Sequence, residues 1–360
     1  MQKIKVSVLC LTYNQKDYIR QCLDSLLMQE TNFNFEVLVN DDASTDETVN
    51  ILREYQKKYP KIVKPIFQKE NQYSKGKRNF ILRYLLPKSR GDYIALCEGD
   101  DYWTDPNKLQ KQVDFLENNK DHSLCFHPVR VIYENINKEE IFPDTNFTGS
   151  YTALELLKWN FIQTNSVMYR KMESYKDINY DVAPGDWYLH LIHAHEGKIG
   201  FINEAMSVYR RHEDGVWWSA ASKNRDSFWI QQAIYYIKLC RELTKLFNNK
   251  EEIDKINFHM DEAINGLLKS KNKESTKIFT EVCIKFPGVI EDYSKRLLNN
   301  NIKLNKDIEY ISNVKKDEKE HLDSQIKKKD EQILELSKEL EDIKHTKAYK
   351  ISDRLKKLRR

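Results

Sequence analysis

The stretch that decides the fold is YIALCEGDDYW, residues 93–103, in which an apolar run ends directly in a cluster of carboxylates. A short apolar run followed by a glycine is typical of a buried strand that ends in a turn. Carboxylates that crowd the end of a buried strand repel one another, and a divalent cation bound through oxygen compensates that repulsion. The stretch therefore predicts a cation that holds a phosphate. The alternative is a polar loop whose acids are only solvated.

Short apolar runs alternate with amphipathic stretches around this strand. We expect strands at residues 4–11, 35–39, 63–67, 93–96 and 123–127. We expect helices at residues 17–29, from residue 44, at residues 77–86 and from residue 105. Such alternation is typical of βαβ units, so the sequence predicts an α/β fold with a mainly parallel sheet flanked by helices.

Two of the expected helices carry signals for where they begin. Ser44 and Glu47 have the spacing of a capping box, in which each side chain satisfies the backbone N–H of the other residue. Asp105 precedes Pro106, the pattern of an N-cap residue followed by proline in the first turn. We expect one helix to begin at each signal.

Polar residues follow three of the expected strands. They are residues 12–14 after the first strand, residues 41–44 after the second, and residues 98–101 after the strand at 93–96. In open α/β sheets, ligands bind outside the carboxyl ends of the strands, so these residues should converge on one crevice. The first strand is followed by neither the glycine fingerprint of dinucleotide-binding folds nor a phosphate-binding P-loop. This argues against an NAD-binding protein or an NTPase.

The overall composition limits the classes of function further. At 360 residues, the chain is long enough for a main domain and an appendage. The net charge of +4 is small against 59 basic and 55 acidic residues, and gives no case for nucleic-acid binding. The cysteines lack CxxC spacing and indicate buried, reduced thiols; they are Cys10, Cys22, Cys97, Cys125, Cys240 and Cys283. With no signal-peptide pattern and no apolar run of about 20 residues, we expect a cytoplasmic protein, at most peripheral at the cytoplasmic face of the membrane.

The last third of the chain has a different pattern. Residues 225–300 are predicted as helices without a polar motif. Further on, apolar residues at heptad spacing, with Lys329 in one core position, predict a short coiled coil; they are Leu322, Ile326, Ile333, Leu336, Leu340 and Ile343. The basic, amphipathic tail either frays in solvent or contacts an anionic membrane. We expect a main domain at residues 1–215, a helical extension at 216–312, a coiled-coil helix at 313–345 that forms a homo-oligomer or an intramolecular hairpin, and the tail at 346–360.

Together, these motifs resemble those of the family 2 glycosyltransferases over roughly residues 4–215. The resemblance implies the GT-A fold, a Rossmann-like sheet that binds nucleotide diphospho-sugars. It implies that Thr12, Tyr13 and Asn14 form a nucleotide-contacting loop. It also implies that Asp42 accepts the base N–H of a uridine nucleotide and that Arg78 reaches the nucleotide.

The same resemblance places residues 98–101 in the DxD element of the family. Asp100 is implied to bind a divalent metal, Mn or Mg, and Glu98 stands where the family has aspartate and is expected to reach a ribose hydroxyl. Asp101 either shapes the site or is a solvated acid before a helix. His212 resembles a histidine that completes the metal and diphosphate shell, with Arg210 or Arg211 beside it to pair with phosphate oxygens. The alternative for His212 is an ordinary surface histidine.

The acceptor side is expected around Asp186, which resembles the base of the family at the start of a helix. A helix N-cap is the alternative for Asp186. Trp187, Trp217 and Trp218 are expected to stack on a sugar or to form a lid. Three nearby histidines are not expected to bind a metal, because the segment has no HExxH frame; they are His190, His193 and His195.

These expectations add up to an inverting, metal-dependent glycosyltransferase. It would move a sugar from a nucleotide-sugar donor, most simply a UDP-sugar, to a hydroxyl of a glycan or lipid-linked acceptor in cell-surface polysaccharide synthesis. One alternative is a nucleotidyltransferase on a related fold, which would favour a phosphate loop rich in glycine and lysine after the first strand. Another is a non-catalytic glycan-binding scaffold, which would leave the metal and base positions empty.

Overall fold

The computed structural model describes residues 3–136, 138–144, 147–173, 175, 178–213, 215–270, 273–299 and 319–345, without the side chains of 216–227, 319–326 and 343–345. The chain forms two compact units. The first comprises Met1–Arg225 and Tyr235–His259, and the second Asp226–Ile234 and Met260–Arg360. The strands and the candidate site belong to the first unit.

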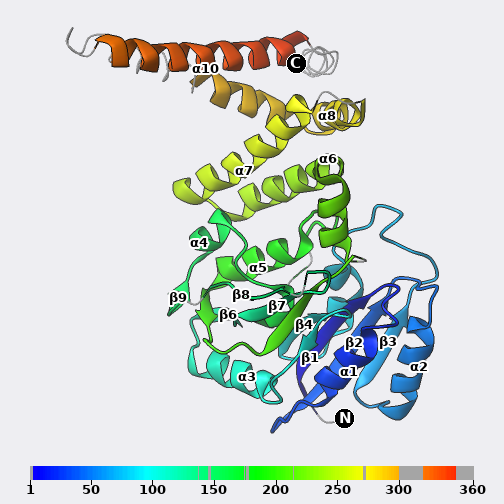
Figure 1. The fold of residues 1–360 in the computed structure, drawn as a ribbon. Coiled ribbons are helices and arrows are strands. Elements are labelled where there is room, and N and C mark those ends of the chain that lie inside the picture. Colours follow the sequence, from blue (N-terminus) through cyan, green and yellow to red (C-terminus); the bar gives the residue numbers. More distant parts are fainter. Residues whose placement is uncertain are drawn as a thin grey trace. The chain divides into compact units, whose positions relative to one another are not determined.

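The first unit is built on an eight-stranded sheet with the order β3-β2-β1-β4-β10-β6-β11-β9 (Figure 1). Its strands are β1 Ile4–Thr12, β2 Asn34–Asp41, β3 Val63–Phe67, β4 Tyr93–Glu98, β6 His122–Phe126, β9 Ser150–Tyr151, β10 Met168–Arg170 and β11 Lys198–Phe201. The first four are parallel, and β6 is parallel to β11. Short β10 joins the two groups, because it pairs antiparallel with both β4 and β6. The predicted strands and the mainly parallel sheet are confirmed.

Helices cover both faces of this sheet. Val8, Val37 and Ala95 point to one face, into a core shared with residues of α1 Ile19–Leu27, α2 Thr48–Lys58 and α3 Lys108–Asn118. Tyr169 points to the other face, where its ring lies against His193 of α5 Gly185–Glu196. Because the central strands are buried on both faces, their sequences are apolar at nearly every position.

A second sheet of four strands, in the order β5-β12-β7-β8, brings distant residues back to the end of β4. Its strands are β5 Tyr102–Trp103, β7 Val129–Tyr133, β8 Lys138–Phe142 and β12 Ser207–Arg211. In the antiparallel pair of β12 and β5, Val208 lies opposite Tyr102. Residues that follow Val208 therefore run back toward the acids that precede Tyr102.

The capping box expected at Ser44 and Glu47 is wrong. Helix α2 begins at Thr48, whose N–H is accepted by Asp46 Oδ1 at 2.9 Å. Ser44 Oγ instead accepts the N–H of Asn14 at 2.9 Å, which ties the loop after β2 to the loop after β1. The Ser44 side chain, which the local pattern predicts as a helix cap, therefore forms a long-range hydrogen bond instead.

Two other expected helices differ from the prediction. Helix α3 begins at Lys108, because Asp105 Oδ1 accepts the N–H of Asn107 at 2.7 Å and closes a turn ahead of the helix. The helix expected at 77–86 is a short wide turn over Ile81–Leu85, followed by a tight turn over Leu86–Lys88. Asn79 has a φ of +55°, and a left-handed residue cannot continue a right-handed helix.

The remaining described segments are largely helical. They include α4 Ala153–Lys158, α6 Val216–Leu246, α7 Lys250–Lys269, α8 Lys273–Lys285, a helix at 287–299, and α10 Lys319–His345. Helix α10 covers the heptad segment, whereas residues 313–318 and the basic tail at 346–360 lie outside the described residues. No described helix has both the length and the apolar character that a membrane crossing requires. All six cysteines are buried free thiols, as predicted.

Candidate active site

The candidate site starts at Glu98, where β4 ends. Gly99 donates its N–H to the Leu11 carbonyl of β1 at 2.8 Å, so the acidic loop crosses directly over the end of β1. A Cβ on Gly99 would lie 2.4 Å from Gln15 Oε1 and 3.0 Å from the Thr12 side chain, so glycine favours this close approach. Beyond the crossing, three acids bring their carboxylate oxygens within 4.8 Å of one another; they are Glu98, Asp100 and Asp101.

The course of β12 brings Arg210, and His212 directly after the strand, close to Asp100. His212 is buried, and its Nε2 lies 3.2 Å from Asp100 Oδ2. The Arg210 guanidinium donates to the Asp100 carbonyl and lies over the rings of Tyr18 and Tyr102, at 5.1 and 4.5 Å from their centroids. Arg210 therefore holds the acidic loop in place rather than extending toward a phosphate.

Asp101 is fully buried, so a solvated acid is the wrong interpretation of this residue. Its carboxylate accepts hydrogen bonds from Asn165 Nδ2 and from the backbone N–H of Arg210, both at 2.9 Å. Asn165 also donates to the Val208 carbonyl at 2.9 Å and accepts a bond from Ser207 at 2.9 Å. Asp101 thus shapes the site by joining the acidic loop to β12.

The electrostatics of the acid cluster suit a cation. Burial raises the pKa of Glu98, and the charges of Asp100 and Asp186 raise it further. Burial and the charges of Asp100 and Glu98 also raise the pKa of Asp101, against the opposing effect of Arg210. Clustered carboxyl groups that resist ionisation lack a compensating positive charge, and carboxylate oxygens with one imidazole are suitable donors for Mn²⁺ or Mg²⁺. The residues present therefore fit a divalent cation.

Asp186 lies in the first turn of α5, after the N-cap residue Pro184, so it is not itself the N-cap. Its Oδ2 lies 3.4 Å from the Nδ2 donor of Asn160. Burial raises the pKa of Asp186, against the opposing effect of its hydrogen bonds. The Asp186 charge also acts on Glu98, so the expected base and the acid cluster lie within electrostatic range.

The loops after β1 and β2 meet, as the sequence predicted. Thr12 is buried beneath the acidic loop, and Tyr13 is 44% exposed. Asn14 Oδ1 accepts the N–H of Thr45 at 2.8 Å, and this bond fixes one loop against the other. The segments expected to contact a nucleotide therefore share one edge of the sheet with the acid cluster.

The Asp42 carboxylate is engaged by the chain itself. Oδ1 accepts the N–H of Gln72 at 2.8 Å, and Oδ2 accepts that of Tyr73 at 3.0 Å. Each carboxylate oxygen has a second acceptor position, so Asp42 can still accept a base N–H. Asp42 therefore fixes the loop that leads to Arg78.

The Arg78 guanidinium is sandwiched between two tyrosine rings. It lies 4.3 Å from the centroid of Tyr73 and 4.4 Å from that of Tyr235 on α6. It also donates to the carbonyls of Tyr73 and Lys77. The rings fix the position of this cation within the loop, a role of α6 that the sequence did not indicate.

Trp187 does not face the acceptor side as expected. It is 5% exposed, its indole N–H donates to the Leu156 carbonyl at 3.0 Å, and its ring stacks on Tyr236. Its ring is therefore occupied by protein contacts, and stacking on a sugar is the wrong interpretation. The side chains of Trp217 and Trp218 lie outside the described residues.

Two of the helix histidines are buried against tyrosines. His190 Nδ1 lies 2.6 Å from the Tyr169 hydroxyl, and His193 Nε2 lies 3.2 Å from that of Tyr175. Burial lowers the pKa of each histidine to about 3, so both are neutral. His195, in contrast, is exposed.

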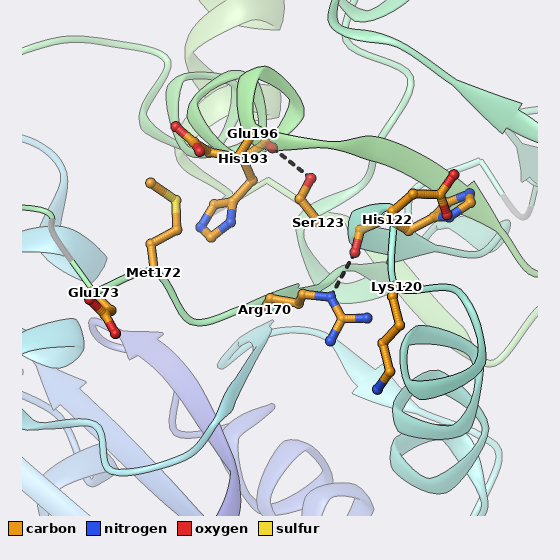
Figure 2. A pocket seen from close by; sticks show the side chains of 9 residues that line it. Lys120, His122, Ser123, Arg170, Met172, Glu173, His193 and Glu196 are labelled. Atoms are coloured by element: carbon orange, nitrogen blue, oxygen red, sulfur yellow. Dashed lines mark hydrogen bonds and ion pairs between the residues drawn. The ribbon is translucent and has the colours of Figure 1, made fainter.

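A pocket of about 450 Å³ lies at the opposite edge of the sheet (Figure 2). His122 and Ser123, at the start of β6, line it together with Arg170, His193 and Glu196. Arg170 is held by the His122 carbonyl and the Tyr93 hydroxyl, at 2.8 and 3.0 Å. Because this pocket lies at the amino end of β6, it is separate from the acid cluster at the carboxyl end of the parallel β4.

Sequence reasoning missed Asn160, Asn165 and Tyr235. Asn160 contacts Asp186, Asn165 contacts Asp101, and Tyr235 contacts Arg78. Each partner is 26 or more residues away in the sequence, and no local motif marks any of the three. Only the tertiary fold reveals them.

Comparison with known proteins identifies the family. The family model described as "Glycosyl transferase family 2" matches residues 7–178. "Uncharacterized protein Rv1520" of Mycobacterium tuberculosis is 48% identical over 224 residues, which are 62% of this chain and 63% of that protein. "Putative glycosyltransferase EpsE" of Bacillus subtilis is 30% identical over 241 residues, which are 66% of this chain and 83% of that protein. The match therefore spans less than two thirds of the mycobacterial relative's length and more than two thirds of the length of EpsE.

Solved structures share the fold. TarS 1–349 of S. aureus in complex with UDP-GlcNAc aligns with a TM-score of 0.58 at 19% identity, over 81% of this chain and 83% of that one. The same protein in complex with UDP aligns with a TM-score of 0.53 at 18% identity, over 77% and 78% of the two chains. The fold is the GT-A fold. The chain belongs to glycosyl transferase family 2.

Proposed function

We propose that this protein is an inverting, metal-dependent glycosyltransferase that transfers a sugar from a UDP-sugar to a hydroxyl of a glycan or lipid-linked acceptor in cell-surface polysaccharide synthesis. The observation that carries the proposal is the cluster of three carboxylates at the end of β4, where His212 Nε2 lies 3.2 Å from Asp100 Oδ2. The proposed base, Asp186, lies in the first turn of α5. The TarS complexes with UDP and UDP-GlcNAc support UDP as the nucleotide.

Asp100 and His212 are the proposed ligands of the divalent metal, Mn²⁺ or Mg²⁺, with Glu98 beside them toward the ribose. Asp100 Oδ2 and His212 Nε2, which lie 3.2 Å apart, would hold the ion together. When bound, such an ion neutralises the diphosphate leaving group. Thr12, Tyr13, Asn14, Asp42 and Arg78 are the proposed contacts of the nucleotide.

The proposed base is Asp186. Its carboxylate takes the proton of an acceptor hydroxyl as that oxygen attacks the anomeric carbon, and the bond to the diphosphate breaks at the same carbon. Attack opposite the leaving group inverts the configuration. Burial raises the pKa of Asp186, which makes the carboxylate a stronger base, and the contact with Asn160 orients it.

UDP release from a panel of UDP-sugars with Mn²⁺ tests the proposal. Asp100→Ala and Asp186→Asn should each lower turnover by about 100-fold or more, because each removes a group that acts in the transition state. Asp186→Asn should retain UDP affinity, whereas Asp100→Ala should lose it. Asp114→Asn, at an exposed acid on α3, is the matched control. Unchanged turnover in both site variants would sink the assignment.

The C-terminal third is proposed to serve assembly. Helix α10 carries the heptad pattern and would pair with a second copy of the chain, and the basic tail would contact anionic lipid near a lipid-linked acceptor. Light scattering of the full chain and of a chain ending at residue 318 distinguishes a dimer from an intramolecular hairpin. The same number of chains per particle in both proteins would exclude pairing through α10.

A further inference from the structure

Tyr235 on α6 holds the loop after β3 from one side. Its ring lies 4.4 Å from the guanidinium carbon of Arg78, and its hydroxyl donates to the Gly76 carbonyl at 3.4 Å. A Cβ on Gly76 would lie 3.3 Å from the same hydroxyl. Tyr73 lies on the other face of Arg78, at 4.3 Å. One side chain of α6 therefore limits both the turn of the loop at Gly76 and the position of the cation in the loop.

The two rings leave one edge of the Arg78 guanidinium to meet a ligand. Nη1 donates to the carbonyls of Tyr73 and Lys77 at 3.3 and 2.8 Å. Nε is buried and has no acceptor among the described residues. Nε and Nη2 form one edge of the guanidinium plane, and such an edge donates two parallel hydrogen bonds when its direction is right. The rings of Tyr73 and Tyr235 fix that direction before a ligand binds.

Tyr235 also contacts the segment that carries the proposed base. Its backbone carbonyl accepts the N–H of Ala183 at 3.5 Å, shortly ahead of Asp186 in the first turn of α5. The loop after β3 reaches the same segment, because Asn79 Oδ1 would lie 2.4 Å from a Cβ on Gly185. The loop expected to contact the nucleotide and the segment of the base are therefore in contact with each other and with Tyr235.

The packing of α6 rests on other residues of the helix. The buried side chains that follow Tyr235 on α6 are Ile237, Leu239, Cys240 and Leu243, whereas Tyr235 itself is half-buried. Helix α6 also lies beyond residues 7–178, which the family model matches. A change at Tyr235 should therefore leave the helix packed, and the match to the family does not account for its contacts.

We propose that Tyr235 is a positioning residue for the transfer: it directs the open edge of Arg78 toward the nucleotide and ties this loop to the segment of Asp186. The proposal rests on the transferase function above and adds to it a residue outside the part of the chain that the family model matches. Loss of the ring releases the Arg78 side chain, so that the nucleotide must order this side chain when it binds.

A double-mutant cycle with UDP and Mn²⁺ tests this role. Tyr235→Ala should weaken UDP binding about fivefold, because a side chain that is no longer fixed must be ordered on binding. Tyr235→Phe keeps the ring and should retain most of the affinity. In an Arg78→Ala background, Tyr235→Ala should change the UDP affinity less than about twofold, since the ring acts through Arg78. Calorimetry measures each affinity, and ligand-observed NMR extends the titration to weakly binding variants.

Trp229→Ala is the matched control, because Trp229 is an aromatic residue of the same helix and is 46% exposed. It should leave the UDP affinity unchanged in both backgrounds. Absence of UDP binding in the wild-type protein would overturn the proposed function and this inference with it. With UDP bound to the wild-type protein, an equal loss from Tyr235→Ala in both backgrounds would overturn the positioning role alone. The same conclusion would follow if Tyr235→Ala bound UDP as tightly as Trp229→Ala, or if Tyr235→Phe bound it as weakly as Tyr235→Ala.

Discussion

Lys108 provides a test of how the core beneath the acidic loop responds to pH. The residue is fully buried; its Nζ donates to Gln112 Oε1 at 2.6 Å and lies 4.1 Å from the ring centroid of Trp103. Burial lowers the pKa of Lys108 from 10.5 to about 7. Below pH 7 the folded protein therefore carries a buried charge. Between pH 7 and 10.5 the unfolded chain binds a proton that the folded chain does not.

The sign and size of the effect follow from linkage. Stability rises with pH wherever the unfolded state binds more protons, so Lys108 makes the protein more stable as pH rises from 7 toward 10.5. At about 1.36 kcal/mol per pKa unit, the whole effect is about 5 kcal/mol. Lys108→Met removes the charge but leaves Gln112 Oε1 without its donor, at a cost of about 1–3 kcal/mol. The variant should therefore be more stable than wild type by about 2 kcal/mol or more at pH 6, and this advantage should vanish as pH rises.

Urea unfolding of wild type and Lys108→Met, followed by tryptophan fluorescence at a series of pH values from weakly acid to alkaline, measures this difference. Subtracting one protein from the other cancels the titration of all shared groups. Lys57→Met, at an exposed lysine of α2, is the control and should show no advantage that depends on pH. A stability difference for Lys108→Met that is constant with pH, or that grows as pH rises, would refute the reasoning.

Three further substitutions probe the amino ends of the strands and the frame of the site. Burial alone would raise the pKa of Glu36, but bonds from Arg90 and Lys64 lower it to about 2, so its contribution is present above pH 4.5 and lost as pH falls toward 2. Glu36→Gln should lower the free energy of unfolding by about 3 kcal/mol at pH 7, and it should reduce the loss of stability between pH 4.5 and pH 2. An unchanged urea midpoint at pH 7 would contradict this prediction. Asn165→Ala should cost about 1–3 kcal/mol because Asp101 loses a buried donor, which chemical unfolding measures. His212→Ala should raise the Mn²⁺ concentration for half-maximal activity about tenfold, and an unshifted titration would remove His212 from the metal site.

The strands could be predicted because their signal is local. A strand buried on both faces must be apolar at consecutive positions, so β1, β2 and β4 are visible as apolar runs. Short β10 has only three residues, and its antiparallel place between β4 and β6 depends on pairing that no local pattern encodes. The polar residues at the strand ends follow from the strands themselves, so their convergence was also predictable.

The errors have a common physical cause, which is that one side chain fits two partners. Ser44 has the spacing of a helix cap, yet its hydroxyl accepts the N–H of Asn14 across the crevice. Trp187 has the apolar face that a sugar would need, but the same face packs on Tyr236 of α6. The sequence shows which bonds a side chain is able to form, but the tertiary fold determines which partner lies within reach.

The return of β12 would couple the proposed metal binding to the stability of the fold. Its pairing with β5 brings His212 to Asp100, and the bonds of Asp101 to Asn165 and to Arg210 hold this arrangement in the buried interior. An ion bound by Asp100 and His212 together would bind only the paired state, and it would stabilise that pairing by an amount that grows with the ratio of the ion concentration to its dissociation constant. Conversely, a substitution that loosens β12 would weaken ion binding to the extent that it lowers the population of the paired state, even when it touches no ligand. The buried polar residues between β4 and β12 would therefore support the proposed cation site together with its proposed ligands.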